Sequence, residues 1–229
     1  MSENAKDRWY RSADWDEASQ AEFAARLSRA RPFDRVQYRR IKALALLDTN
    51  DPARQQAGRA MLEENLAIPD LFSFERTVAL TTLARHERSR GRLPRALRAL
   101  RQALAVGGPD ASGTTGEEEI ELAEVLLAQG VDGDIAEAKA LLDRRASDPP
   151  IFVRSRYRLA VAQTRVCLAL GDPLAAAAWA SQALELADTE HSGLRNHPEL
   201  GLIDPPVAER TWLREVASVG QPRGDDPEH

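Results

Sequence analysis

The sequence of 229 residues has one cysteine, few aromatic residues and no long apolar run, and each shortage excludes a class of protein. The lone thiol of Cys167 makes neither an internal disulfide nor a cysteine-based metal site. The longest apolar stretch, residues 174–180, is far shorter than the roughly 20 residues that a membrane span needs. The polar N-terminus also lacks the pattern of a signal peptide, so we expect a cytoplasmic protein that does not bind membranes.

Positive charge is also in short supply, because 31 basic residues stand against 36 acidic ones and give a formal net charge of −5. Nucleic-acid-binding domains are usually basic, so this balance argues against a nucleic-acid partner. What the sequence has instead is alanine. Alanine-rich sequences with few β-branched residues favour helix, and no segment shows the alternation typical of a strand. The sequence therefore predicts an all-α protein.

Helical periodicity, capping residues and helix breakers predict four consecutive helix pairs between two capping segments. The expected pairs span residues 34–67, 71–106, 117–146 and 152–187, with a capping helix at 8–31 and a loop followed by a helix at 189–218. These elements are expected to form a single helical-repeat domain over residues 8–218. The polar ends, residues 1–7 and 219–229, are expected to be disordered.

Local signals set several of these boundaries. Asp51 followed by Pro52 is typical of a helix start, and Ser12 or Asp14 is expected to cap the first helix. Aromatic residues gather in the N-terminal capping segment and are expected to pack in its core; they are Trp9, Tyr10, Trp15 and Phe23. The C-terminal cap is expected to pack through Val207, Trp212, Leu213 and Val216. Cys167 lies between apolar neighbours, which predicts a buried and unreactive thiol.

Small residues recur at regular distances in the expected helix pairs. The turn glycines Gly91, Gly133 and Gly171 are 42 and 38 residues apart, and alanine follows each glycine five residues later. In the first pair, Asp48 takes the place of the glycine, and Ala53 and Ala60 stand at the matching offsets. Small residues on one helix face let a neighbouring helix approach closely, as tight antiparallel pairs require.

This pattern resembles the tetratricopeptide repeat family over about residues 34–187. The best-matching stretch runs from Thr77 to Gly108 and carries Leu80, Leu83, Ala84, Gly91, Ala96, Leu100 and Ala103 at the expected positions. The resemblance implies an antiparallel helix-pair solenoid, an α–α superhelix whose first helices line a concave groove. It also implies a non-enzymatic scaffold or regulatory module for protein–protein interaction, and it identifies no partner.

Basic residues on three of the four expected first helices make the candidate binding site. They are Arg35, Arg39, Lys42, Arg85, Arg88, Arg154 and Arg158. Forked guanidinium groups suit carboxylates, so a groove lined by these side chains is expected to bind an acidic peptide or partner segment. An ordinary solvated face is the alternative interpretation, and Glu121 and Glu124 interrupt the pattern on the third first helix.

Two other functions stay open at this point. A small-molecule-sensing or catalytic protein would place its pocket near residues 189–206 and use His191 or His197 with Glu199. A structural protein would assemble as a homo-oligomer through its end caps. The histidines lack the spacing of a helical zinc site, and no constellation of acid and base residues is evident. We therefore expect no enzymatic activity, no cofactor and no metal site.

Overall fold

The computed structural model describes residues 8–107, 117–192, 195 and 200–219, and within these ranges it contains helices and no strand. The prediction of an all-α protein is therefore confirmed. Residues 1–7 and 220–229, which the sequence predicts to be disordered, lie outside the described residues. The chain divides into two compact units, Met1–Thr114 and Thr115–His229.

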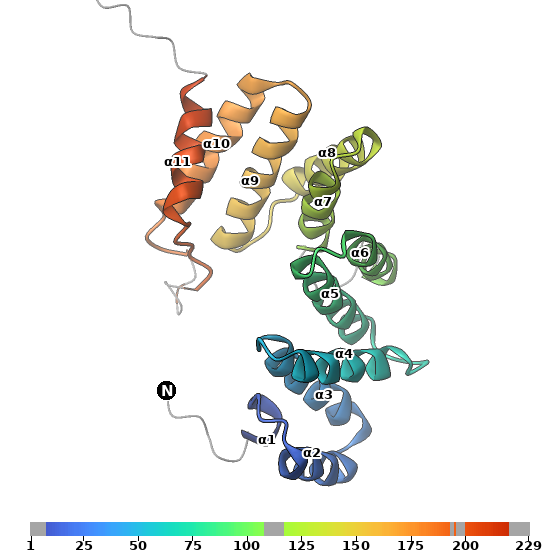
Figure 1. Cartoon of the computed structure of the whole chain (residues 1–229). Coiled ribbons are helices and arrows are strands. Elements are labelled where there is room, and N and C mark those ends of the chain that lie inside the picture. The colour runs from blue at the N-terminus through green and yellow to red at the C-terminus, as the bar shows by residue number, and fades with distance from the viewer. Residues whose placement is uncertain (1–7, 108–116, 193–194, 196–199, 220–229) are drawn as a thin grey trace, which may run out of the picture. The chain divides into compact units, whose positions relative to one another are not determined.

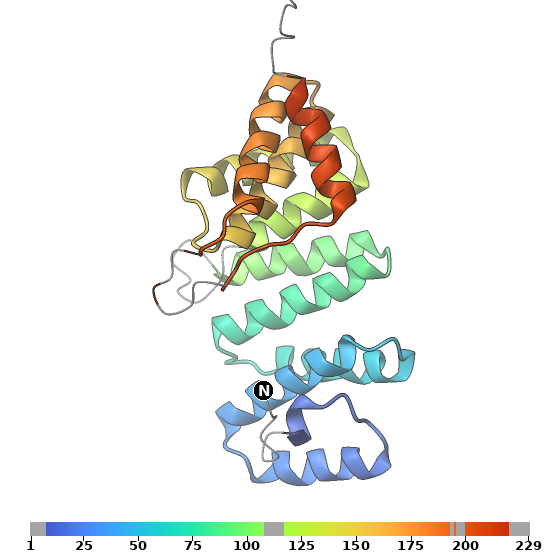
Figure 2. The same ribbon diagram turned by 90° about the vertical axis from the view of Figure 1, so that its left-hand side faces the viewer.

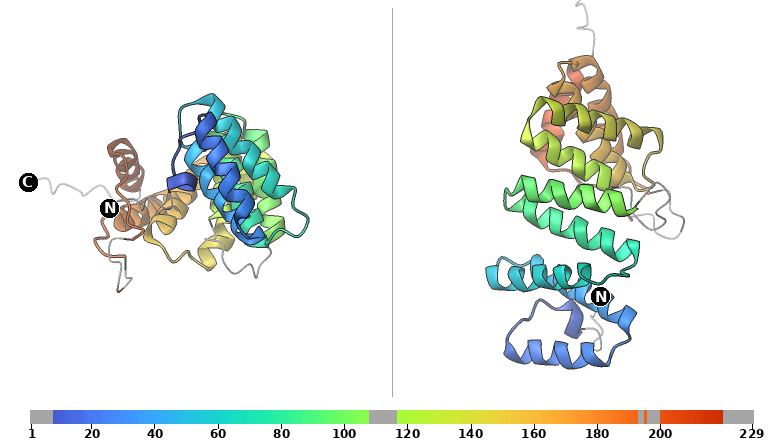
Figure 3. Two further views of the ribbon diagram at one scale, coloured as in Figure 1. Left: turned by 90° about the horizontal axis from the view of Figure 1, so that it is seen from below. Right: turned by 90° about the vertical axis from the view of Figure 1, so that its right-hand side faces the viewer.

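Unit 1 contains six helices within its described residues (Figure 1). They are α1 (Arg8–Arg11), α2 (Glu17–Arg29), α3 (Pro32–Leu47), α4 (Pro52–Leu66), α5 (Ser73–Ser89) and α6 (Leu93–Gly107). Helix α3 packs against α4, and α5 packs against α6. The helices from α3 to α6 follow one another in chain order in Figure 2, and the views in Figure 3 agree that α5 and α6 lie side by side. These two pairs correspond to the expected pairs at 34–67 and 71–106.

Unit 2 contains five helices within its described residues. They are α7 (Glu118–Gln129), α8 (Asp132–Ser147), α9 (Val153–Ala169), α10 (Pro173–Ala187) and α11 (Val207–Ser218). The C-terminal helix α11 packs on α10, buries Leu213, and accepts a hydrogen bond from the Tyr157 hydroxyl to Glu209 at 2.8 Å. Val207 was expected to pack in this cap, but its side chain is 82% exposed, so the apolar contact begins further along the helix.

Helix starts follow the capping chemistry of the sequence in most places. The Asp51 carboxylate accepts a hydrogen bond from the Ala53 N–H at 2.8 Å, and Pro52 is the first residue of α4. Helix α2 differs from the expectation, because Asp16, rather than Ser12 or Asp14, accepts from the Ser19 N–H at 2.7 Å. The backbone carbonyls of Ser12 and Asp14 instead accept hydrogen bonds from the Lys42 ammonium.

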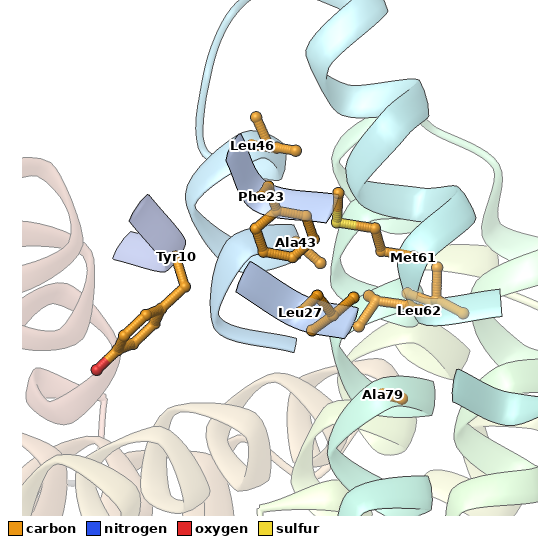
Figure 4. Packing of buried hydrophobic residues seen from close by; sticks show 9 residues of the cluster. Tyr10, Phe23, Leu27, Ala43, Leu46, Met61, Leu62 and Ala79 are labelled. Carbon is orange, nitrogen blue, oxygen red and sulfur yellow. The ribbon is translucent and has the colours of Figure 1, made fainter. Parts of the chain in front are cut away.

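The N-terminal aromatic residues pack in the core of unit 1, as predicted. Phe23 and Leu27 of α2 lie beside Ala43 of α3 and Met61 and Leu62 of α4 (Figure 4). Around this group the rings form edge-to-face and tilted contacts, with centroids 5.1 Å apart for Trp9 and Tyr10, 4.9 Å for Trp9 and Tyr38, and 5.8 Å for Trp15 and Phe23. The capping segment therefore covers an apolar face of α3 and α4 that would otherwise meet solvent.

A small residue at a matching position in the second helix of each pair is fully enclosed. These residues are Gly58, Ala96, Ala138 and Ala176, spaced by 38, 42 and 38 residues. The register predicted for the first pair is wrong, because Ala53 and Ala60 are exposed and Gly58 makes the close contact with α3. The turn glycine of the third pair is also corrected. Gly130 ends α7 with a φ of 69°, whereas Gly133 lies inside α8.

The two units repeat the same pattern at a distance of 80 residues. Helices α4 and α8 begin 80 residues apart, and so do α5 and α9, and α6 and α10. Positions 80 residues apart are here called corresponding positions. Most positions that are buried in a helix of one unit are also buried at the corresponding position of the other unit. Matching residues at corresponding positions include Leu62 and Leu142, Phe72 and Phe152, Gly91 and Gly171, and Ala103 and Ala183. Differences between corresponding positions therefore show where one unit has acquired distinct chemistry.

Candidate functional site

The three basic residues predicted on α3 point to three different partners. Arg35 donates hydrogen bonds from Nε to the Ala30 carbonyl at 2.8 Å and from Nη2 to the Ser28 carbonyl at 2.7 Å. It therefore binds the last carbonyls of α2, a structural role. Arg39 lies 3.5 Å from an exposed carboxylate, that of Glu64. The structure does not gather these side chains into one stripe.

Lys42 departs furthest from the prediction of a surface cation. Its side chain is 1% exposed, and its ammonium donates hydrogen bonds to the carbonyls of Ser12 at 2.8 Å and Asp14 at 2.9 Å. The rings of Trp15 and Phe23 lie 5.5 and 6.0 Å from the ammonium. Burial lowers the pKa of Lys42 below its usual value. Lys42 holds the segment between α1 and α2 in place and is not accessible to a partner.

Arg158 binds the acidic residues that interrupt the predicted basic pattern. Its guanidinium lies 3.2 Å from Glu117, 3.7 Å from Glu121 and 3.1 Å from Glu124. Burial alone would lower the pKa of Arg158, but these carboxylates raise it above its usual value. Arg158 therefore ties α9 to α7 inside unit 2. Its neighbour Arg154 is exposed.

The two predicted arginines of α5 have a different setting. Arg85 is exposed and Arg88 is partly buried. Arg85 lines a shallow groove of about 480 Å³ between α3 and α5 of unit 1, here called the α3–α5 groove. The remaining lining residues are Leu44, Ala45, Leu47, Asp48, Thr82, His86 and Ser89.

A second hollow, here called the arginine pocket, adjoins this groove. It has a volume of about 420 Å³ and is lined by Pro52, Gln55, Gln56, Arg59, Ala60, Glu63, His86, Arg90 and Arg92. His86 lines both the arginine pocket and the α3–α5 groove, so the two hollows meet at this side chain. Helix α4 supplies one wall, while the end of α5 and the turn at Gly91 supply the other.

Buried Glu87 organises the cations of the arginine pocket. Arg59 lies 3.3 Å from Glu87 and 2.8 Å from Glu63, and Arg92 donates a hydrogen bond to Glu87. Burial alone would raise the pKa of Glu87, but the Arg92 hydrogen bond and the charges of Arg92 and Arg59 hold it below its usual value. Among the described residues, the acceptor for Arg90 is the neutral amide of Gln55. Three guanidinium groups thus face this pocket with two carboxylates to balance them.

Neutral His86 adds a polar group without adding charge. Burial lowers the pKa of His86, and the nearby charge of Arg90 lowers it further. The imidazole is therefore neutral at neutral pH and can donate or accept one hydrogen bond at the junction of the two hollows.

Replacing Glu87 by glutamine is expected to remove a pH-dependent part of the stability. Because the folded protein holds the Glu87 pKa below the usual 4.5, the ionised carboxylate stabilises the fold above that pH. This contribution is lost as the pH falls through the lowered pKa. In urea unfolding at a series of pH values, the stability difference between wild type and Glu87→Gln should be largest near neutrality and shrink below pH 4.5. A difference independent of pH would contradict the ion-pair network. Glu215→Gln serves as the control, because Glu215 is exposed and forms no ion pair with a described residue.

The spacing of basic residues along the first helices does not point to the arginine pocket. Arg90 and Arg92 flank the turn glycine, and Arg59 reaches Glu87 from another helix. A comparison of corresponding positions could have found it. Unit 2 carries Leu170, Asp172 and Cys167 where unit 1 carries Arg90, Arg92 and Glu87. Cys167 is buried, as predicted, and burial raises the pKa of its thiol.

The alternative pocket near residues 189–206 is only partly described. His191 is exposed, whereas His197 and Glu199 lie outside the described residues. Within the described ranges, no three His, Cys, Asp or Glu side chains are grouped as metal ligands. None of the described helices combines the length and the apolar composition needed to cross a membrane. Comparison of the chain with family models, curated proteins and solved structures finds no match.

Proposed function

We propose that the protein is a non-enzymatic interaction module that binds an acidic segment of a partner protein in the arginine pocket. The observation that carries this proposal is the excess of guanidinium groups over carboxylates in a hollow of about 420 Å³. Arg90 supports it most directly, because a carboxylate of the partner would replace a neutral amide as its acceptor.

The ion pairs at Glu87 favour binding by reducing its entropic cost. Arg59 and Arg92 are held in position by Glu87 before any ligand arrives, so less side-chain freedom is lost on binding. An acidic chain longer than the pocket would continue past His86 into the α3–α5 groove, where Leu44 and Leu47 offer apolar contact.

The proposal keeps the class of function that the tetratricopeptide resemblance implies and moves the binding site. The enclosed small residues Gly58, Ala96, Ala138 and Ala176 support tetratricopeptide-like packing of the two helices within each pair. The acidic partner segment remains the proposed ligand. The residues proposed to bind it are now Arg59, Arg90 and Arg92.

Reversing the charge of Arg90 is expected to weaken binding of an acidic peptide by about tenfold or more, since it adds repulsion as well as removing a donor. The probe is a fluorescein-labelled oligo-glutamate peptide, and the readout is its fluorescence anisotropy with Arg90→Glu and with wild type. The matched control is Arg98→Glu, which makes the same charge change on an exposed position of α6 outside the pocket.

The control should lose less than about twofold in affinity, and wild-type affinity should fall as salt is added, because salt screens exposed charges. Equal losses in the two variants would show that only net charge matters. That result would overturn the arginine pocket as the binding site.

A further inference from the structure

Two exposed aromatic rings in unit 1 line a cavity that the arginine pocket does not include. Phe33 of α3 is 55% exposed, and Phe72, which precedes α5, is 63% exposed. Their ring centroids are 5.5 Å apart in an edge-to-face arrangement. Together they line a cavity of about 360 Å³ with Pro32, Val36, Ile68, Asp70, Leu71 and Glu75. This surface is here called the aromatic ledge.

Leaving the aromatic ledge exposed to water costs free energy. Exposed phenylalanine rings beside an apolar cavity forgo the free energy that burial would supply, and clustered exposed apolar side chains mark interaction surfaces. Six of the eight lining residues are apolar, and the two charged ones, Asp70 and Glu75, are both acidic.

The corresponding phenylalanine in unit 2 is partly covered by the chain itself. Phe152 precedes α9 as Phe72 precedes α5, yet it is only 36% exposed. Gly201 lies so close that an added Cβ would be 3.0 Å from the Phe152 ring. The Gly201 carbonyl also accepts a hydrogen bond at 2.7 Å from the N–H of Arg154, the second residue of α9.

The amide that corresponds to this donor has no acceptor among the described residues of unit 1. It is the N–H of Phe74, the second residue of α5, and no described residue bonds to it. The first amides of a helix lack partners within the helix and are satisfied by caps, water or ligands. Unit 1 therefore presents an aromatic ring and an amide without a described acceptor, at the positions that correspond to the two groups that Gly201 contacts in unit 2.

We propose that the aromatic ledge binds an extended apolar segment of a partner protein, resembling residues 201–206 of this chain but carrying a basic side chain. A backbone carbonyl of the segment accepts from the Phe74 N–H, and its apolar side chains fill the cavity beside Phe33 and Phe72. This inference is independent of the arginine pocket, which lies on other residues.

The acidic residues at the rim of the aromatic ledge favour a partner segment that carries a basic side chain. Unit 1 has Asp70 and Glu75 where unit 2 has Pro150 and Ser155. Glu75 is paired with Arg40 at 2.7 Å, while Asp70 is exposed and forms no ion pair with a described residue. A basic side chain in the bound segment complements Asp70. Residues 201–206 of a second copy would instead bring Asp204 to this acidic rim, which disfavours self-association.

The test uses a peptide with the sequence of residues 201–206 in which Asp204 is replaced by lysine. The whole protein is labelled with ¹⁵N at its five phenylalanines, so that each phenylalanine gives its own backbone amide signal in the NMR spectrum. Titration with the peptide should shift the signals of Phe33, Phe72 and Phe74. The signals of Phe23, in the core, and of Phe152, already in contact with Gly201, should stay in place.

Two substitutions and one peptide control complete the experiment. Phe72→Ala should weaken peptide binding by at least about tenfold, the effect of removing a central aromatic contact, whereas exposed Val207→Ala should leave it unchanged. Asp70→Asn, or a peptide that retains Asp204, should weaken binding by about two- to fivefold, the range of an exposed ion pair.

Three results would overturn the proposal. The first is the absence of shifts at Phe72 and Phe74 when the peptide is in excess. The second is a shift of Phe152 equal to that of Phe72, which would mean that the peptide displaces the segment at Gly201. The third is a concentration-dependent shift of Phe72 without peptide, together with dimers in sedimentation, which would make the ledge an interface between copies.

Discussion

Replacing Gly58 by alanine is expected to lower the free energy of unfolding by about 1–3 kcal/mol, although alanine is the better helix former. The added Cβ would lie 2.8 Å from the Ala43 carbonyl oxygen, 3.1 Å from Leu47 and 3.2 Å from Leu46. A backbone oxygen cannot rotate away, so α3 and α4 would have to separate. Urea unfolding followed by far-ultraviolet circular dichroism measures the change.

Gly133→Ala is the matched control for this substitution. Gly133 also lies in a second helix, α8, but an added Cβ would meet no atom within 4 Å. Gly133 is the second residue of α8, where alanine gains less over glycine than in a helix interior, so the same change should raise stability by up to about 0.5 kcal/mol. Stabilisation by both variants would contradict the close approach of α3 and α4 at Gly58.

Replacing Arg158 by methionine is expected to cost about 2–4 kcal/mol, because it removes a partly buried cation that three carboxylates share. Methionine keeps most of the side-chain length, so the loss reports the charge more than the packing. The same denaturant titration applies.

Arg154→Met provides the comparison one turn earlier on α9. Arg154 is exposed, so its replacement should change stability by less than about 0.5 kcal/mol. Both residues belong to the basic pattern read from the sequence, and the two substitutions test whether they differ in their contribution to stability. Equal and small effects would mean that Arg158 is a solvated cation and that its contacts with α7 contribute nothing.

The helices were predictable from sequence because their ends depend on local chemistry. Asp51 with Pro52 starts α4, and Gly91 ends α5 with a positive φ of 71°, which glycine adopts at little cost. These signals involve residues a few positions apart. The turn glycine of the third pair was predicted wrongly because two glycines stand close together. Gly130 and Gly133 both fit the end of α7, and only the backbone conformation distinguishes them.

The candidate site was not predictable in the same way, because its contacts join distant residues. Helical spacing places Arg39 and Lys42 on one side of α3, but it does not say which neighbour covers each of them. The partners of Lys42 lie 28 and 30 residues earlier, and the closest contacts of Arg158 lie 34 to 41 residues earlier. Likewise, the sequence shows Gly58 only as a poor helix former, and its close approach to the Ala43 carbonyl is visible only in the structure. Which cations face solvent therefore depends on the tertiary packing of other segments against each helix.

The enclosure of Lys42 makes it a natural reporter of motion in the N-terminal segment. Acylating reagents attack the neutral amine, and a lowered pKa enlarges that fraction, yet the side chain is 1% exposed. Modification therefore has to wait until the segment holding Ser12 and Asp14 lifts away, an opening that need not unfold the rest of unit 1. The rate of acylation at Lys42, compared with that at accessible Lys139, then measures how often this cover opens.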